Sequence, residues 1–120
     1  MQISKDKLGK QVKKQVEEIF YQTLADLRRK EDAQIFVRDF LTKTEQIVLT
    51  KRLAIAMYLE KGRSYEEIKN ALKVSSATIA SVDKMMQQKS EGFILALKRI
   101  EAEEWAAQLV KKISRFFKNL

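Results

Sequence analysis

The near absence of residues that interrupt helices limits this chain's fold more than any other feature. The 120 residues include no proline and only three glycines, Gly9, Gly62 and Gly92. In a helix interior, proline costs roughly 3 kcal/mol and glycine roughly 1 kcal/mol relative to alanine. The sequence therefore predicts an all-α protein. Its length predicts a single domain, residues 1–120, built around one core.

Charge limits the partners that such a chain would favour. Lys and Arg total 24 against 16 Asp and Glu, which gives a net charge of +8. This excess favours contact with polyanions, either nucleic acid or an anionic lipid surface, and does not choose between them. The chain has no cysteine, no apolar signal-peptide core at its start and no apolar run long enough for a membrane span. We expect a cytoplasmic protein without disulfides.

Apolar periodicity and capping signals predict most of the helices. Apolar residues at steps of three and four predict a helix over about residues 5–30, followed by a shorter apolar segment at 35–41. Thr42 and Glu45 have capping-box spacing, which predicts a helix that starts there and runs to about Glu60. Gly62 suits the left-handed position after that helix. A long amphipathic helix is predicted over residues 93–120.

The stretch EEIKNALKVSSATIASVDK, residues 66–84, predicts two short helices joined by a turn of about three residues. Ser64 begins a second capping box, and Ser75 can cap the second helix. That helix carries an apolar stripe of Ile79, Val82 and Met86, which can hold it at an angle to the first. Residues 64–86 therefore have the pattern of a helix-turn-helix.

The opposite side of the second helix consists of small and basic residues. Ala77, Ser81 and Lys84 lie across the helix from the apolar stripe. Small side chains let a helix approach base edges closely in the major groove, and the positive helix N-terminus suits phosphate. The same pattern fits a packing hairpin, in which the small residues only allow close contact between helices. Spacing favours the DNA-binding interpretation and leaves the packing one open.

The segment LTKRLAIAMYLEKGRSYEEIKNALKVSSATIAS, within residues 41–86, is similar to the Trp repressor superfamily. Its second half also resembles the helix-turn-helix of many bacterial regulators. The resemblance implies a six-helix, Trp-repressor-like intertwined homodimer with a long C-terminal helix. Such a dimer presents two reading helices to half-sites about one DNA turn apart. It implies a sequence-specific transcriptional regulator of double-stranded DNA, a repressor, at the bacterial nucleoid.

The resemblance also implies roles for particular residues. Lys69 matches a phosphate-contacting lysine of the family. Four residues near the start of the second helix match positions that face DNA in the family: Ser76, Ala77, Thr78 and Ala80. Nearby cations add affinity for phosphate, unless they are ordinary solvated surface charges. The expected DNA-binding residues are Arg63, Lys69, Lys73, Ser75, Ser76, Ala77, Thr78, Ala80, Ser81 and Lys84.

The ligand site of tryptophan-responsive members matches poorly. Arg52 matches one of two arginines that sandwich the indole, but Ser81 stands at the second position. Val82 replaces a glycine, and its side chain would fill space that the ligand needs. We therefore expect no tryptophan binding, with Arg52 as the one candidate contact for another small-molecule corepressor.

The predicted C-terminal helix, 93–120, has more apolar surface than one small chain would leave exposed. It fits a dimerisation arm, a helix that binds a groove of another protein, or a helix on a membrane surface. The dimer is favoured because the N-terminal helix also has an apolar stripe without a partner. The stripe of the C-terminal helix comprises Trp105, Leu109, Val110, Ile113, Phe116, Phe117 and Leu120.

Catalysis has little support in this sequence. The chain contains no His and no Cys and has no glycine-rich phosphate loop. We expect neither an enzyme nor a metal site nor a cofactor. The alternative to a DNA-binding regulator is a helical module that binds another protein or a membrane surface without binding DNA.

Overall fold

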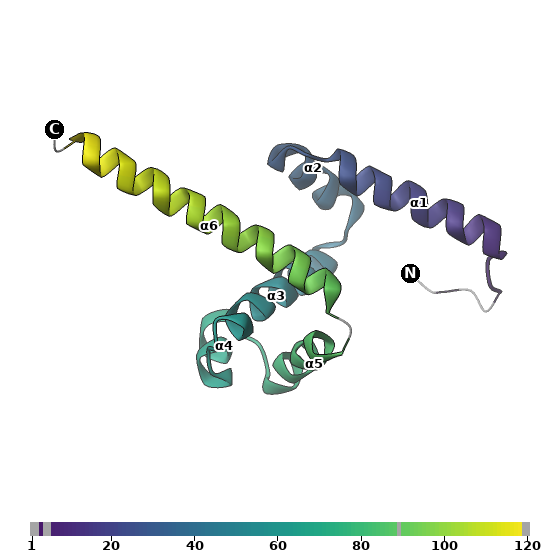
Figure 1. Cartoon of the computed structure of the whole chain (residues 1–120). Helices are drawn as coiled ribbons and strands as arrows, with labels where there is room; N and C mark the ends of the chain where they lie inside the picture. The colour runs from purple at the N-terminus through teal and green to yellow at the C-terminus, as the bar shows by residue number, and fades with distance from the viewer. Residues whose placement is uncertain (1–2, 4–5, 89, 119–120) are drawn as a thin grey trace. The chain divides into compact units, whose positions relative to one another are not determined.

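The computed structural model describes residues 3, 6–88 and 90–118, and among these it has six α-helices and no strand (Figure 1). For residues 114 and 116–118 it describes the backbone alone. The all-α class is thus confirmed. The helices are α1 (Lys10–Asp26), α2 (Lys30–Phe40), α3 (Lys43–Glu60), α4 (Tyr65–Leu72), α5 (Ser76–Gln87) and α6 (Glu91–Lys118).

Contacts within the chain divide it into two units, and the boundary in the sequence falls between Ile47 and Val48, inside α3. The N-terminal unit contains α1, α2 and the first turn of α3. The C-terminal unit contains the rest of α3 together with α4, α5 and α6. The single domain expected from chain length stays a prediction.

The N-terminal unit has two helices where the sequence predicted one long helix and an apolar segment. Helix α1 ends at Asp26, short of the predicted residue 30, and α2 begins at Lys30. Glu31 and Asp32 lie in the first turn of α2, where the helix dipole favours acidic side chains. No residue of α1 or α2 is buried, although the rings of Phe36 and Phe40 stack 4.9 Å apart.

The predicted capping box before α3 is confirmed. The N–H of Thr42 donates to the Glu45 carboxylate at 2.8 Å, and the N–H of Glu45 donates to the Thr42 hydroxyl at 3.1 Å. These two bonds satisfy donors that the helix itself leaves without acceptors. The bond from the Thr42 N–H, and next the contact with its hydroxyl, lower the pKa of Glu45.

Helix α3 ends near Glu60, as predicted, and Gly62 has the left-handed conformation with φ +75°. The Gly62 N–H donates to the Leu59 carbonyl at 3.0 Å, and the Arg63 N–H donates to the Tyr58 carbonyl at 3.0 Å. This pair of bonds is a Schellman motif, which glycine allows at little cost. The motif turns the chain directly into α4.

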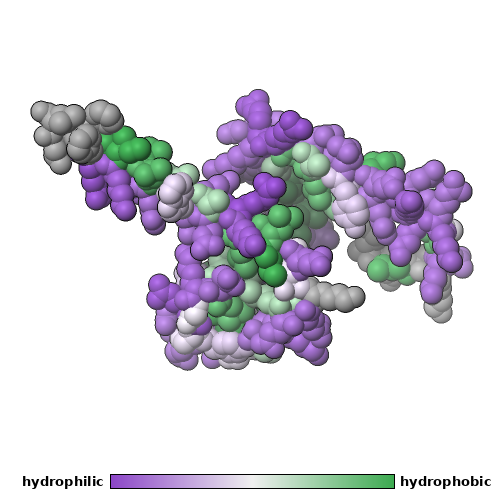
Figure 2. All heavy atoms as spheres, viewed as in Figure 1, coloured by the Kyte–Doolittle hydropathy of each residue, from purple (hydrophilic) through white to green (hydrophobic). Residues whose placement is uncertain are grey.

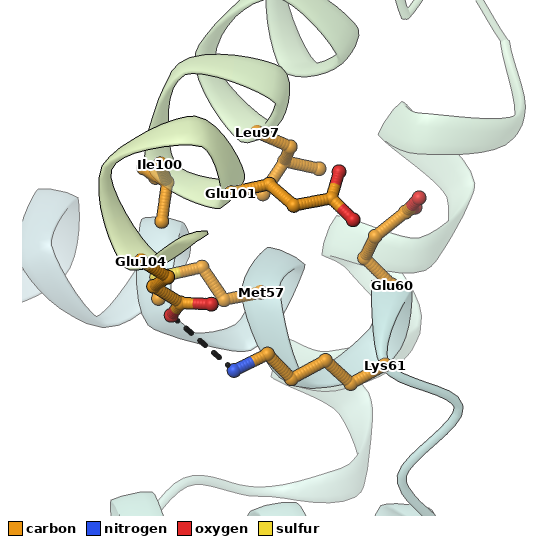
Figure 3. A pocket seen from close by; sticks show the side chains of 7 residues that line it. All are labelled: Met57, Glu60, Lys61, Leu97, Ile100, Glu101 and Glu104. Carbon is orange, nitrogen blue, oxygen red and sulfur yellow. Dashed lines mark hydrogen bonds and ion pairs between the residues drawn. The ribbon is translucent and has the colours of Figure 1, made fainter. Parts of the chain in front are cut away.

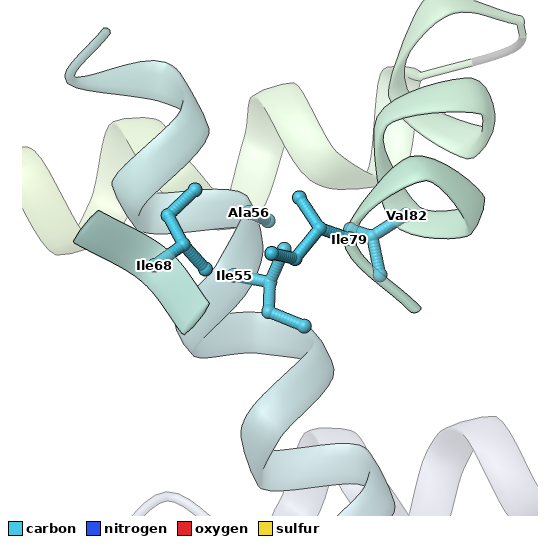
Figure 4. Packing of buried hydrophobic residues seen from close by; sticks show 5 residues of the cluster. All are labelled: Ile55, Ala56, Ile68, Ile79 and Val82. Atoms are coloured by element: carbon cyan, nitrogen blue, oxygen red, sulfur yellow. The ribbon is translucent and has the colours of Figure 1, made fainter. Parts of the chain in front are cut away.

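The described core lies in the C-terminal unit, where α3, α4 and α5 meet. Five residues, Ile55, Ala56, Ile68, Ile79 and Val82, are at most 3% exposed and form one cluster (Figure 4). Partly buried side chains surround them, among them Leu72, Val74 and Phe93. The core therefore fixes α4 and α5 against α3.

Helix α6 is continuous over its 28 residues, about 42 Å at 1.5 Å per residue. It begins at Glu91, two residues before the predicted start. The side chains of Phe116 and Phe117, and all of Leu120, lie outside the described residues, so their part in the predicted stripe is untested. Among the described helices, none is both long and apolar enough to cross a membrane.

Candidate nucleic-acid interface

Helices α4 and α5, with residues 73–75 between them, form the tight two-helix unit that the sequence predicted. The Ser64 hydroxyl accepts the Glu67 N–H at 3.2 Å, and the Ser75 hydroxyl accepts the Thr78 N–H at 3.1 Å. Both predicted serine caps are thereby confirmed. Because the caps set the first residue of each helix, they also set the length of the turn.

The turn between the two helices depends on a left-handed lysine. Lys73 has φ 54° and ψ 55°, and its N–H donates to the Lys69 carbonyl at 2.9 Å. The Lys51 ammonium, on α3, donates to the Lys73 carbonyl at 3.3 Å. The turn is therefore tied to α3 as well as to α4.

Because Lys73 adopts a conformation that favours glycine, Lys73→Gly should stabilise the protein. We expect the free energy of unfolding to rise by about 1 kcal/mol, since glycine has no Cβ to clash in this region. Lys73→Ala is the matched control because it removes the charge and keeps the Cβ. Denaturant titration of both variants measures the effect, and an equal gain in Lys73→Ala would point to charge rather than backbone strain.

Two side chains of α5 hold that helix on the core. Ile79 is fully buried and Val82 is 3% exposed, and both pack in the cluster with Ile55 and Ile68. These contacts fix which side of α5 faces inward. The side that carries Ser76, Ala77 and Ser81 consequently faces away from the core.

A hydrogen bond between side chains also ties α4 to α5. The Tyr65 hydroxyl, at the start of α4, donates to Asp83 of α5 at 2.9 Å. This bond to Asp83 is the main reason that the pKa of Tyr65 is raised. Asp83 also accepts a hydrogen bond from Gln87 at 3.1 Å. The bond between Tyr65 and Asp83 adds a polar restraint to the apolar packing between the two helices.

The predicted contact residues on α5 are all exposed, and we refer to them together as the α5 outer face. It consists of Ser76, Ala77, Thr78, Ala80, Ser81 and Lys84. The Thr78 hydroxyl lies 2.9 Å from that of Ser75, so this pair serves the cap. In the first turn of α5, the N–H groups of Ser76 and Ala77 have no acceptor inside the helix. The face combines small side chains with a positive helix end.

The predicted cations differ in their surroundings. Lys69 and Lys73 are exposed at the end of α4, close to the start of α5. Arg63 is 3.5 Å from the Glu67 carboxylate, so a phosphate would have to compete with that ion pair. Arg52 is half-buried on α3, whereas Ser81 is exposed on α5 and Val82 is in the core.

Sequence reasoning missed the two long-range ties of this unit. Lys51 and Lys73 are 22 positions apart, and Tyr65 and Asp83 are 18 apart. Helical periodicity relates residues three or four positions apart, so it contains no signal for either bond. Only the packing of α3, α4 and α5 brings these groups together.

Comparison with known proteins places this geometry in a family. Residues 14–101 match the family model described as Trp repressor protein, which extends from α1 into α6. The chain belongs to the Trp repressor family. Members of this family are DNA-binding regulatory proteins and not enzymes. The resemblance inferred from residues 41–86 is therefore confirmed, and it extends over the flanking helices.

A relative in Bacillus subtilis (strain 168) supports the same membership of the Trp repressor family. It is named Uncharacterized protein YerC and is 29% identical over 91 residues, which cover 76% of this chain and 86% of the relative. Its name gives no activity, so it supports kinship alone. The Trp repressor match ends at residue 101, whereas α6 continues to Lys118.

Proposed function

We propose that this protein binds double-stranded DNA sequence-specifically as a homodimer and represses transcription at the bacterial nucleoid. The observation that carries the proposal is the orientation of α5. Ile79 and Val82 anchor one side of the helix in the core, and the α5 outer face remains exposed. A helix held in this way, with small outer side chains, can enter the major groove closely.

Affinity in this proposal comes mainly from phosphate contacts. Lys84 adds a positive charge to the α5 outer face, Lys69 and Lys73 are exposed at the end of α4, and the N-terminus of α5 adds its helix dipole. Arg63 contributes where a phosphate replaces Glu67. Binding through such contacts releases counterions, so the affinity should fall steeply as salt increases.

Specificity should depend on more than direct base contacts. Ser76 and Ser81 can hydrogen-bond to bases but lack the bidentate reach of Arg or Asn, which gives about 1–3 kcal/mol per base pair. Bridging water and DNA shape are therefore expected to contribute, an expectation inherited from the Trp repressor–operator complex. We propose no dependence on tryptophan, because Val82 fills the position that the ligand requires.

The proposed homodimer follows from apolar surface that each unit leaves exposed. In α1, Val12, Val16 and Ile19 are 49%, 53% and 68% exposed. In α6, Trp105 is 65% exposed. Soluble proteins rarely leave such stripes uncovered, so a second chain is the expected partner. A dimer would also present two copies of α5 to two half-sites.

Lys69→Ala tests the proposal directly. We expect affinity for duplexes to fall by at least about three- to tenfold at low salt, and the slope of log affinity against log salt to become shallower by about 2, because a homodimer loses two phosphate contacts. Fluorescence anisotropy at several salt concentrations, with and without tryptophan, measures both quantities. Lys98→Ala is the matched control, because it removes the same charge from α6.

Two results would contradict this function. One is the absence of duplex binding by the unmodified protein even at low salt, which would favour the interaction or membrane-surface module instead. The other is an equal loss of affinity in Lys69→Ala and Lys98→Ala, because binding would then depend on net charge and not on the surface around α5.

A further inference from the structure

The buried side chains of α5 fix which side of the helix faces inward, but they restrain small tilts and rotations less closely. Ile79 and Val82 are buried, and Met86 packs against the same cluster. Burial of apolar area has no preferred direction, so it leaves a helix some freedom to tilt and to turn about its axis. A binding site needs its side chains held to about 0.5 Å and 10–20°. Restraints outside the core are therefore expected to matter for the reading of DNA.

Two hydrogen bonds outside the core restrain α5 at separate points. The Lys51 ammonium donates to the Lys73 carbonyl, in the turn before α5, at 3.3 Å. The Tyr65 hydroxyl donates to Asp83 at 2.9 Å. Asp83 is seven residues beyond Ser76, where α5 begins, so the two points lie about 10 Å or more apart along the helix. Over that length, a shift of about 1 Å at one point tilts the helix by about 6°.

The bond from Lys51 acts on the backbone where the chain passes from α4 to α5. The Lys73 carbonyl belongs to the planar peptide group that joins Lys73 to Val74, so fixing the carbonyl restrains rotation on both sides of that group. Val74 packs against the core, and the Ser75 hydroxyl caps α5. A rotation of this peptide group would therefore be transmitted directly to the start of α5.

The bond from Tyr65 acts on the rotation of α5 about its own axis. At about 100° per residue, Asp83 lies about 40° around the helix from Ile79, at the edge of the buried side. A hydrogen bond at this edge opposes rotation, because its donor and acceptor must stay nearly aligned. A rotation would also carry Ala77 and Ser81 away from the base edges that they would face in a complex.

The helix that carries Lys51 is itself held at its other end. Met57 of α3 and Ile100 of α6 line a cavity of about 270 Å³ (Figure 3). Lys61, directly after α3, forms an ion pair with Glu104 of α6 at 3.4 Å. These contacts come from the first half of α6, whereas its second half has hydrophobic side chains along one side and hydrophilic side chains along the other (Figure 2). Lys51 therefore acts from a helix with contacts of its own, apart from those to α5.

We propose that Lys51 and Tyr65 are positioning residues for DNA reading, which set the tilt and the rotation of α5 without contacting the duplex. The inference rests on the proposed function, because it requires that the α5 outer face reads DNA. Both bonds are exposed, and water competes for the same groups, so they should contribute little to the stability of the fold. Their removal should therefore weaken discrimination between duplexes more than it weakens folding.

Tyr65→Phe is the cleaner test, because it removes one hydroxyl and no charge. Fluorescence anisotropy measures its affinity for two duplexes of about 30 base pairs, long enough for two half-sites. One duplex is selected from a random pool with the unmodified protein, and the other has the same composition in scrambled order. We expect the ratio of the two affinities to fall by at least about fivefold, as when one good base contact is lost. The salt dependence should stay unchanged, because no phosphate contact is removed.

Tyr21→Phe is the matched control for Tyr65→Phe. It removes the same atom from α1, where Tyr21 is 61% exposed, and it should leave the affinity ratio unchanged.

Lys51→Met tests the bond to the turn, because it removes the ammonium and keeps the apolar length of a half-buried side chain. We expect the affinity ratio to fall as in Tyr65→Phe. Lys51→Arg keeps the charge and a donor that can reach the Lys73 carbonyl, so it should retain most of the discrimination. Thermal unfolding of each variant, followed by circular dichroism, measures the loss of stability separately.

The affinities for the two duplexes distinguish positioning from other roles. A positioning role lowers affinity mainly for the selected duplex. A phosphate contact by Lys51 would lower both affinities by the same factor and make the salt dependence shallower, and a purely structural role would lower both in proportion to the loss of folded protein. Either of these results, or an unchanged ratio in Tyr65→Phe, would overturn the inference while duplex binding by the unmodified protein remains. Failure to select any duplex with the unmodified protein is a separate result, which would contradict the proposed function and this inference with it.

Discussion

Replacing Ala77 with glutamate should reduce duplex binding by at least about 100-fold without destabilising the fold, because it places a negative charge where phosphates and base edges would approach. Ala77 is exposed in the first turn of α5, so a larger side chain meets no core residue there. A carboxylate near a helix N-terminus is favourable by about 0.3–1 kcal/mol. Binding and stability are thus expected to change in opposite directions.

Anisotropy titrations and thermal unfolding together measure this Ala77→Glu effect. Ala77→Gln is the matched control, because glutamine has nearly the same size without the charge, and we expect it to retain more of the affinity. Retention of full duplex binding by Ala77→Glu would exclude the α5 outer face as the surface that contacts DNA.

Ile79→Ala should give the largest loss of stability among alanine substitutions in α5. Ile79 is fully buried in a cluster of five buried residues, so the removed side chain leaves a cavity where α3, α4 and α5 meet. Such truncations cost about 2–5 kcal/mol. We expect a decrease of about 3 kcal/mol in the free energy of unfolding. Duplex binding should weaken with it, since α5 loses its anchor.

Met85→Ala is the control in the same helix, because Met85 is 37% exposed. Its expected cost is below about 1 kcal/mol, as for most surface changes. Denaturant titration of both variants provides the comparison. Similar losses in the two variants would mean that the side of α5 facing the core is not the one described.

Local signals predicted the boundaries of α4 and α5 closely. Ser64 and Ser75 begin their helices, and Gly62 turns the chain after α3, because each acts through hydrogen bonds within a few residues. The same kind of signal predicted the capping box that Thr42 and Glu45 form before α3. Where a residue's effect is local, its spacing in the sequence is enough to predict it.

Other features could not be predicted in that way. The bonds from Lys51 to the turn and from Tyr65 to Asp83 require the packed arrangement of three helices. The end of α1 was predicted at about residue 30 but lies at Asp26, because the apolar periodicity includes Leu27, which follows the helix. Apolar periodicity along α6 did not distinguish Phe93, which packs against the core, from Trp105, which is exposed, because that difference depends on where the helix meets its own unit.

The lack of any buried residue in α1 and α2 has a consequence for regulation. In the proposed homodimer, helices without a core of their own gain their stability on association, so folding and assembly form one equilibrium. The concentration of dimers able to bind an operator would then rise more steeply than the total amount of protein in the cell, up to about its square. A modest change in synthesis or degradation would shift repression sharply, with no effector molecule involved.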